Sequence, residues 1–182
     1  MVWKALIGAI MSALFALAAP SAIAADAAQL SKDAQATLQS LYAKVPAAKA
    51  LGPQAQAILV FPKVTKAGLG IGGQYGDGAL IKGGKTVAYY NTTGASFGLQ
   101  AGAQTYGYAL FFMNDKALQA IDKAEGFEVG VGPSVVVMDE GMAKTMTTTT
   151  MKDDIYAFIF GQKGLMAGLG IQGNKITKIN PK

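Results

Sequence analysis

The pattern of apolar and polar positions changes once along the chain, near Ala57. Before that point, apolar residues recur at helical spacing: Leu30, Ala34, Leu38, Leu41, Tyr42 and Val45. This pattern predicts an amphipathic helix over Asp26–Lys44, which Pro46 ends. A short second helix is expected over Ala47–Leu51, because a proline suits a first helical turn and Gly52-Pro53 follows.

From Ala57 onward, helix formers give way to glycine, β-branched and aromatic residues, which predicts strands. The expected strands are Ile58–Phe61, Gly68–Tyr75, Ala79–Lys82, Thr86–Thr92, Ser96–Met113 (one bent strand or two), Phe127–Val131, Ser134–Met138, Ile155–Phe160, Leu165–Ile171 and Lys175–Ile179. Gly76-Asp77-Gly78 predicts a hairpin turn, and Gly83-Gly84-Lys85 predicts the next one. A helix is expected over Asn114–Ala124, and Thr145–Met151 is expected to be a strand or an edge loop.

These elements predict an α+β fold. The sheet is expected to be mostly antiparallel, with amino-terminal helices before it and one helix inserted into it. Regular strand spacing and many glycine bends favour either a sandwich or a partly closed barrel.

The first 24 residues have the three zones of a secretory signal peptide. Lys4 gives a positive start, Ala5–Ala19 is apolar and uncharged, and Ala22-Ile23-Ala24 is a small-x-small cleavage site. Cleavage is expected after Ala24 or Ala25, which leaves residues 25–182 as a single domain. A membrane anchor is the alternative, since residues 5–25 carry no charge and are long enough to span a bilayer. Against an anchor, Pro20-Ser21 interrupts this apolar run. We therefore expect export to the periplasm or to the periphery of the outer membrane.

Three residue types are missing, and their absence narrows the chemistry. The chain has no Cys and no His, and all its basic residues are Lys. Ser-His-Asp and Cys-His catalysis and most zinc sites are thereby excluded, so we expect a non-catalytic protein without a cofactor. Loss of Lys4 with the leader lowers the net charge from +5 to about +4. That balance suits an acidic surface as partner and is too weak for a nucleic-acid binder.

A glycine motif occurs twice, in Ala67–Gly73 and again in Ala167–Gly173. Both copies match G-x-G-x-x-G, but a dinucleotide site requires a helix directly after the motif. Gln74–Gly78 cannot open a stable helix, and the second copy lies near the chain end. The alternative interpretation is structural: glycines at every second position empty one face of a strand, so that another segment can pack closely against it.

Four lysines form the candidate binding site: Lys63, Lys66, Lys82 and Lys85. If Gly76–Gly78 is a hairpin turn, the chain brings all four to one end of the sheet. The alternative is that they are ordinary solubilising surface lysines. The paired carboxylates Asp139-Glu140 and Asp153-Asp154 lie in expected turns, and neighbouring strand residues point to opposite faces, so they do not predict a catalytic dyad.

Four segments together resemble the SYLF domain family. Phe61-Pro62-Lys63 with Ala67–Gly78 resembles its opening motif, Gly94–Gln104 its second block, Met113–Leu118 its helix start and Lys163–Gly168 its closing block. The resemblance covers about Leu30 to Gly173, with the blocks in the family's order.

The resemblance implies lipid binding. Eukaryotic members associate with phosphoinositides and acidic membranes, and some fungal members bind actin. It also implies that an amino-terminal amphipathic helix, here Asp26–Lys44, acts with a basic surface, here the four lysines. We therefore expect a lipid-binding module of the cell envelope whose partner is anionic phospholipid or a membrane surface. An envelope structural domain, or a β-domain that binds other proteins, is the alternative.

Overall fold

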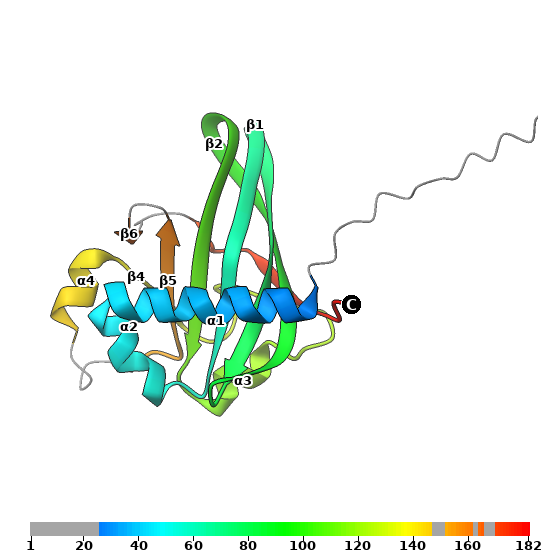
Figure 1. The fold of residues 1–182 in the computed structure, drawn as a ribbon. Helices are drawn as coiled ribbons and strands as arrows, with labels where there is room; N and C mark the ends of the chain where they lie inside the picture. Colours follow the sequence, from blue (N-terminus) through cyan, green and yellow to red (C-terminus); the bar gives the residue numbers. More distant parts are fainter. Residues whose placement is uncertain (1–25, 147–151, 162–163, 166–169) are drawn as a thin grey trace, which may run out of the picture.

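The computed structural model of the protein describes residues 26–146, 152–161, 164–165 and 170–182. The predicted leader lies outside these residues, as do most of Thr145–Met151 and the centre of Leu165–Ile171. The described chain starts and ends side by side, since the Ala27 amide donates a hydrogen bond of 3.2 Å to the Lys182 carbonyl (Figure 1).

The two amino-terminal helices form where the sequence predicts them. Helix α1 spans Ala27–Lys44, and the Asp26 carboxylate caps it by accepting a hydrogen bond of 3.1 Å from the Ala28 amide. Helix α2 spans Pro46–Leu51 and continues into a 3-10 turn over Gly52–Gln54. Both predictions are confirmed.

Two long strands form most of the sheet. Strand β1 spans Ala57–Lys82, strand β2 spans Lys85–Phe112, and they pair antiparallel along their length. The predicted turn at Gly83-Gly84 joins them, and both glycines have the positive φ that this turn requires (58° and 78°). We call this strand pair the ribbon.

The hairpin turn predicted at Gly76–Gly78 is wrong. Asp77 lies inside the ribbon opposite Asn91, whose side-chain amide donates a hydrogen bond of 2.9 Å to the Asp77 carboxylate. The ribbon instead bends back on itself at Leu69–Ile71, where Gly70 has φ +72° and the pairing register shifts. Figure 1 shows the bent end of the ribbon rising beyond helix α1 and strand β5.

Glycines hold the two limbs of β1 close together. A Cβ on Gly76 would lie 2.7 Å from the Lys63 carbonyl oxygen, and one on Gly78 would lie 2.6 Å from that of Val60. Gly76 and Gly78 therefore serve close backbone approach rather than a turn, which explains the error. The structural interpretation of the alternating glycines is confirmed for the first copy of the motif, since a Cβ on Gly68 would collide with the backbone of Gly72.

Five shorter strands complete a curled, mostly antiparallel sheet. They are β3 (Phe127–Glu128), β4 (Val135–Met138), β5 (Ile155–Gly161), β6 (Gly164–Leu165) and β7 (Lys175–Ile179). The order is β3-β7-β2-β5-β4, with β1 on β2 and β6 on β5; the β4–β5 pair is parallel. The predicted α+β fold class is confirmed. Of the two predicted architectures, a sandwich and a partly closed barrel, the sheet forms the second, as a half-barrel.

Two short helices lie between the strands. Helix α3 (Asp115–Ala120) is the predicted inserted helix, shorter than expected and capped by Asn114. Helix α4 (Glu140–Thr145) was not predicted. The Asp139 carboxylate accepts a hydrogen bond of 2.7 Å from the Met142 amide, so Asp139-Glu140 begins a helix and not a turn.

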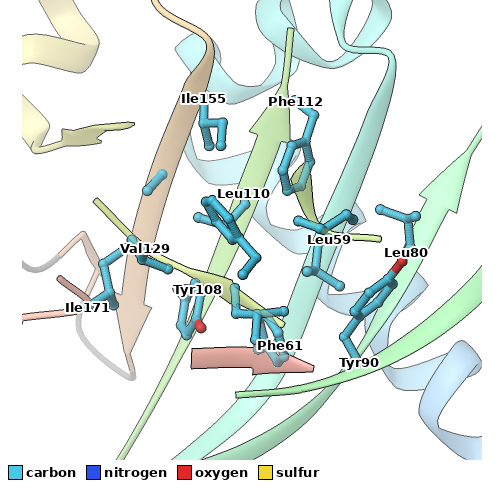
Figure 2. Packing of buried hydrophobic residues seen from close by; sticks show 14 of the residues in the cluster. Leu59, Phe61, Leu80, Tyr90, Tyr108, Leu110, Phe112, Val129, Ile155 and Ile171 are labelled. Atoms are coloured by element: carbon cyan, nitrogen blue, oxygen red, sulfur yellow. The ribbon is translucent and has the colours of Figure 1, made fainter. Parts of the chain in front are cut away.

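The sheet buries residues on both faces. Its inner face forms one core, where side chains of β1, β2 and β5 converge (Figure 2): Leu59, Phe61, Leu80, Tyr90, Tyr108, Leu110, Phe112 and Ile155. On the outer face, Ile58, Val60, Ala79 and Ile81 pack with α1 and α2. Helix α1 therefore rests on both limbs of β1.

Candidate functional site

A pocket of about 280 Å³ opens between the carboxyl-terminal half of α1 and three strands. Its lining comes from α1 and the residue after it (Thr37, Ser40, Leu41, Lys44, Val45), β1 (Pro62, Lys63), β2 (Thr105, Tyr106, Gly107) and β5 (Phe160, Gly161). The volume lies just below the range of about 300 to 1,000 Å³ that is usual for ligand pockets.

The pocket owes part of its shape to Gly107. A Cβ there would collide with the Phe160 ring and would lie 2.9 Å from the Pro62 carbonyl oxygen. Because glycine leaves this space free, the Phe160 ring lies directly against the β2 backbone. An aromatic ring and aliphatic side chains thus line a pocket whose polar residues come equally from α1 and from the strands.

Among the described residues, two lysines and no acidic residue line the pocket. Lys44 is in the last turn of α1 and Lys63 is exposed on β1. The salt bridges within the described parts of the chain are Lys144–Glu140 and Lys178–Asp122, so neither pocket lysine is in one. Both ammonium groups are therefore free of carboxylate partners among the described residues.

The four predicted site lysines form two separate pairs. Lys82 and Lys85 flank the Gly83-Gly84 turn, and there Gly84 accepts a hydrogen bond of 3.2 Å from Gln35 in the first half of α1. Lys63 lies with Lys44 at the other end of α1, and Lys66 lies farther along β1 toward the bend. The prediction of one cluster is wrong, because it depended on the absent turn at Gly76–Gly78.

Lys44 is the pocket residue that sequence reasoning missed as a partner of Lys63. The sequence does place Lys44 in the last turn of a predicted helix, immediately before Val45-Pro46. What the sequence did not show is where that helix end lies against the sheet. That position follows from the packing of Leu38 and Leu41 on the outer face.

The apolar face of α1 is already used within the fold. Leu30, Ala34, Leu38 and Leu41 are buried, and what the helix exposes is polar residues and alanine, the polar ones including Lys32, Asp33, Gln39 and Ser40. None of the helices in the described ranges has both the length and the apolar character needed to cross a membrane. In this structure α1 can therefore offer a ligand only its polar face and its pocket edge.

A buried polar network lies behind the pocket. The Tyr106 hydroxyl donates a hydrogen bond of 2.6 Å to Gln74 Oε1, and Gln74 Nε2 donates one of 2.6 Å to Asn174 Oδ1. Next to it, the Tyr108 hydroxyl donates a hydrogen bond of 2.6 Å to Thr92 Oγ1. Because Tyr106 also lines the pocket, this network fixes the position of the part of the pocket wall that Tyr106 forms.

The buried tyrosines predict a loss of stability in alkali. Burial raises the pKa of Tyr106 to about 12, and burial also raises the pKa of Tyr108. A pKa that is higher in the folded than in the unfolded protein favours folding below the unfolded pKa of about 10. We expect the free energy of unfolding to be insensitive to these groups below pH 10 and to fall as the pH rises toward 12.

Urea unfolding measured between pH 8 and 11.5 tests this expectation, with absorbance at 295 nm reporting phenolate formation. The Tyr106→Phe variant is the control, and its stability should fall less steeply above pH 10. An identical slope in both proteins would contradict the assignment of Tyr106.

A comparison with family models identifies the chain. Residues 93–181, about half of it, match the Ysc84 family, described as Las17-binding protein actin regulator. No curated protein sequence matches. The matched segment runs from the middle of β2 to the end of the described sheet and includes three of the four blocks that resemble SYLF domains. The chain therefore belongs to the SYLF domain family of Ysc84, a family of binding modules.

Proposed function

We propose that this protein is a non-catalytic lipid-binding module of the cell envelope that takes an anionic amphiphile into the pocket between α1 and the sheet. The observation that supports it most is the pocket lining, which in the described part of the chain combines apolar walls with Lys44 and Lys63 and includes no carboxylate. Apolar walls accept part of an acyl chain, and ammonium groups pair with a phosphate or carboxylate head group.

The charge distribution supports an anionic partner. From Ala34 to Asn114 the sequence has six lysines (44, 49, 63, 66, 82 and 85) and Asp77 as its one acidic residue. The Asp77 carboxylate accepts hydrogen bonds from Tyr75 and Asn91, which engage it locally. Lysines act as point charges, so the attraction to a lipid surface should be strongly salt-dependent.

The proposal places the module outside the cytoplasm, after removal of residues 1–24. Mass spectrometry of the protein recovered from a periplasmic fraction would test this part. A mass that begins at Ala25 or Asp26 supports export, and an intact Met1 in the cytoplasmic fraction contradicts it.

The separation of the four lysines makes the binding site testable. We expect Lys63→Glu/Lys66→Glu to lower the affinity for anionic vesicles by at least about tenfold, since each lysine near such a surface contributes about 1 kcal/mol. Lys82→Glu/Lys85→Glu makes the same change in net charge at the other end of α1, and we expect a clearly smaller loss. Co-sedimentation with phosphatidylglycerol vesicles over a salt series measures both.

Two results would contradict this prediction. Equal losses in both double variants would mean that only net charge matters, and no sedimentation of the unmodified protein at low salt would overturn lipid binding itself. Circular dichroism of each variant controls for folding.

A protein partner is the second candidate function. It is favoured by the description of the Ysc84 family, which names Las17 binding and actin regulation. Native mass spectrometry separates the two: a co-purifying amphiphile supports the lipid proposal, whereas a lipid-free protein with one stoichiometric protein partner supports the alternative.

A further inference from the structure

Among the described residues, exposed apolar side chains cluster at one place. Large apolar side chains that are more than half exposed occur at Leu69 (80%), Ile71 (72%), Tyr75 (56%), Val87 (54%) and Val131 (60%). The first three fall within seven consecutive residues at the bend of the ribbon. Exposed apolar groups that gather at one site mark an interaction surface, whereas scattered ones do not.

Leu69 and Ile71 lie at the bend of β1, where they pair with Ala101 and Phe97 of β2, and we call Leu69–Ile71 the ribbon tip. They flank Gly70, and the limbs behind them are held together by the close approach of Gly68 and Gly72. In Figure 1 this end of the ribbon stands clear of α1 and β5. The fold thus presents two bulky apolar side chains on a braced support.

Positive charge and an aromatic ring lie directly behind the ribbon tip. Lys66 is three residues before Leu69, which is about 10 Å along a strand that rises about 3.3 Å per residue. Tyr75 is four residues after Ile71 on the returning limb, and Lys63 lies beside Gly76 in the same limb pair. This order matches the layers of a bilayer surface: the apolar side chains at the ribbon tip would reach the acyl chains, and the tyrosine and lysine behind them would lie among the head groups.

The charge behind the ribbon tip decides which occupant fits. A protein partner would need a matching apolar hollow, and no observation on this chain points to one. An anionic bilayer needs only apolar groups that reach past the head groups and lysines that stay level with the phosphates. The other apolar surface expected to contact lipid, that of α1, is buried against β1 and is not available.

We propose that the ribbon tip inserts into the boundary between the head groups and acyl chains of an anionic bilayer, with Lys66 contacting phosphates. This inference rests on the proposed lipid-binding function and adds the membrane-docking element to it. Lys63 belongs both to this limb pair and to the lining of the pocket, so docking would bring lipid close to the pocket.

A tryptophan placed at the ribbon tip tests insertion directly. The single Trp of the chain, at position 3, lies in residues 1–24, so a background without these residues leaves Leu69→Trp as the only indole. With phosphatidylglycerol vesicles we expect its emission to shift to shorter wavelength and to be quenched by brominated acyl chains. Val87→Trp in the same background is the control, because Val87 is also exposed but lies near the Gly83-Gly84 turn, and its emission should not change.

A pair of polar variants measures the contribution to affinity. We expect Leu69→Ser/Ile71→Ser to lower the vesicle partition coefficient by about tenfold or more, as loss of two inserted side chains implies. Val87→Ser/Val131→Ser removes exposed apolar side chains elsewhere and should leave the partition coefficient within about twofold. Thermal melting should be similar for both, because none of the four side chains is buried.

The outcomes separate this inference from the proposed function. If the Leu69→Trp variant sediments with vesicles but its indole emission stays unchanged, the ribbon tip does not insert and lipid binding stands. If the unmodified protein does not sediment, both proposals fail. If Leu69→Ser/Ile71→Ser leaves vesicle binding intact and instead dissociates an oligomer in light scattering, the ribbon tip is a protein interface and the inference is overturned.

Discussion

Gly78→Ala should lower the free energy of unfolding by about 3 kcal/mol. The added methyl carbon would lie 2.6 Å from the Val60 carbonyl oxygen and equally close to the Phe61 ring. Neither can move easily, because Val60 pairs with Ala109 in the ribbon and Phe61 is fully buried in the inner core. The cost comes entirely from packing, since Gly78 does not have a positive φ.

Gly73→Ala is the matched control for this change. It lies in the same strand, and the nearest atom to its added methyl carbon would be the Gly94 carbonyl oxygen at 3.8 Å. We expect its stability to be unchanged or to rise by up to about 1 kcal/mol, because alanine restricts the unfolded chain. Urea unfolding measures both variants, and equal stabilities would show that the limbs of β1 are not packed as described.

Gln74→Met should also cost about 3 kcal/mol, for a different reason. Methionine keeps the length of the side chain but can replace neither of its short hydrogen bonds, to Tyr106 and to Asn174. Two buried polar groups then lose a partner, and each costs about 1 to 3 kcal/mol. In the described part of the chain every buried polar side-chain atom already has a hydrogen-bond partner, so none is left over to bond Tyr106 and Asn174 in place of Gln74.

Gln54→Met provides the same chemical change at an exposed position. Gln54 Nε2 donates a single hydrogen bond of 3.1 Å to the Ala50 carbonyl at the surface, where water replaces it. We expect a change below about 0.5 kcal/mol. Thermal and urea unfolding of both variants test the comparison, and a Gln74→Met protein as stable as the Gln54→Met protein would contradict the buried network.

The local elements were predictable where a single segment determines them. Helices α1 and α2, strand β7 and the turn at Gly83-Gly84 follow from apolar spacing, Pro46 and paired glycines. Helix α4 was missed because six residues that include Gly141 carry little helical signal, although Asp139 and Glu140 suit a helix start.

The bend of the ribbon was not predictable, because the same residue type serves two purposes. Glycine at 76 and 78 has the composition of a turn, yet both positions are needed for close backbone packing. Only the facing residues, Lys63 and Val60, distinguish the two uses, and they are far away in sequence. The error about Gly76–Gly78 then misplaced two of the four site lysines.

The pocket depended on the same long-range packing. Lys63 was named from the sequence, but its neighbours Lys44 and Phe160 come from elements that meet it only in the folded protein. The exposed Leu69 and Ile71 read as ordinary strand residues in the sequence. Only the bend shows that they stand at an apex, with their side chains largely exposed.

The contact between Ala27 and Lys182 has a consequence for the rate at which the chain folds. The first residue of α1 is hydrogen-bonded to a residue about 155 positions away, and β2 pairs with β7 at separations of up to 90 residues. Such distant contacts slow folding, typically to milliseconds or seconds, because long loops must close before the contacts form. Because β2 and β7 lie far apart along the chain, the sheet closes only after both have been made, which favours passage of a still unfolded chain through a channel, as the proposed export requires.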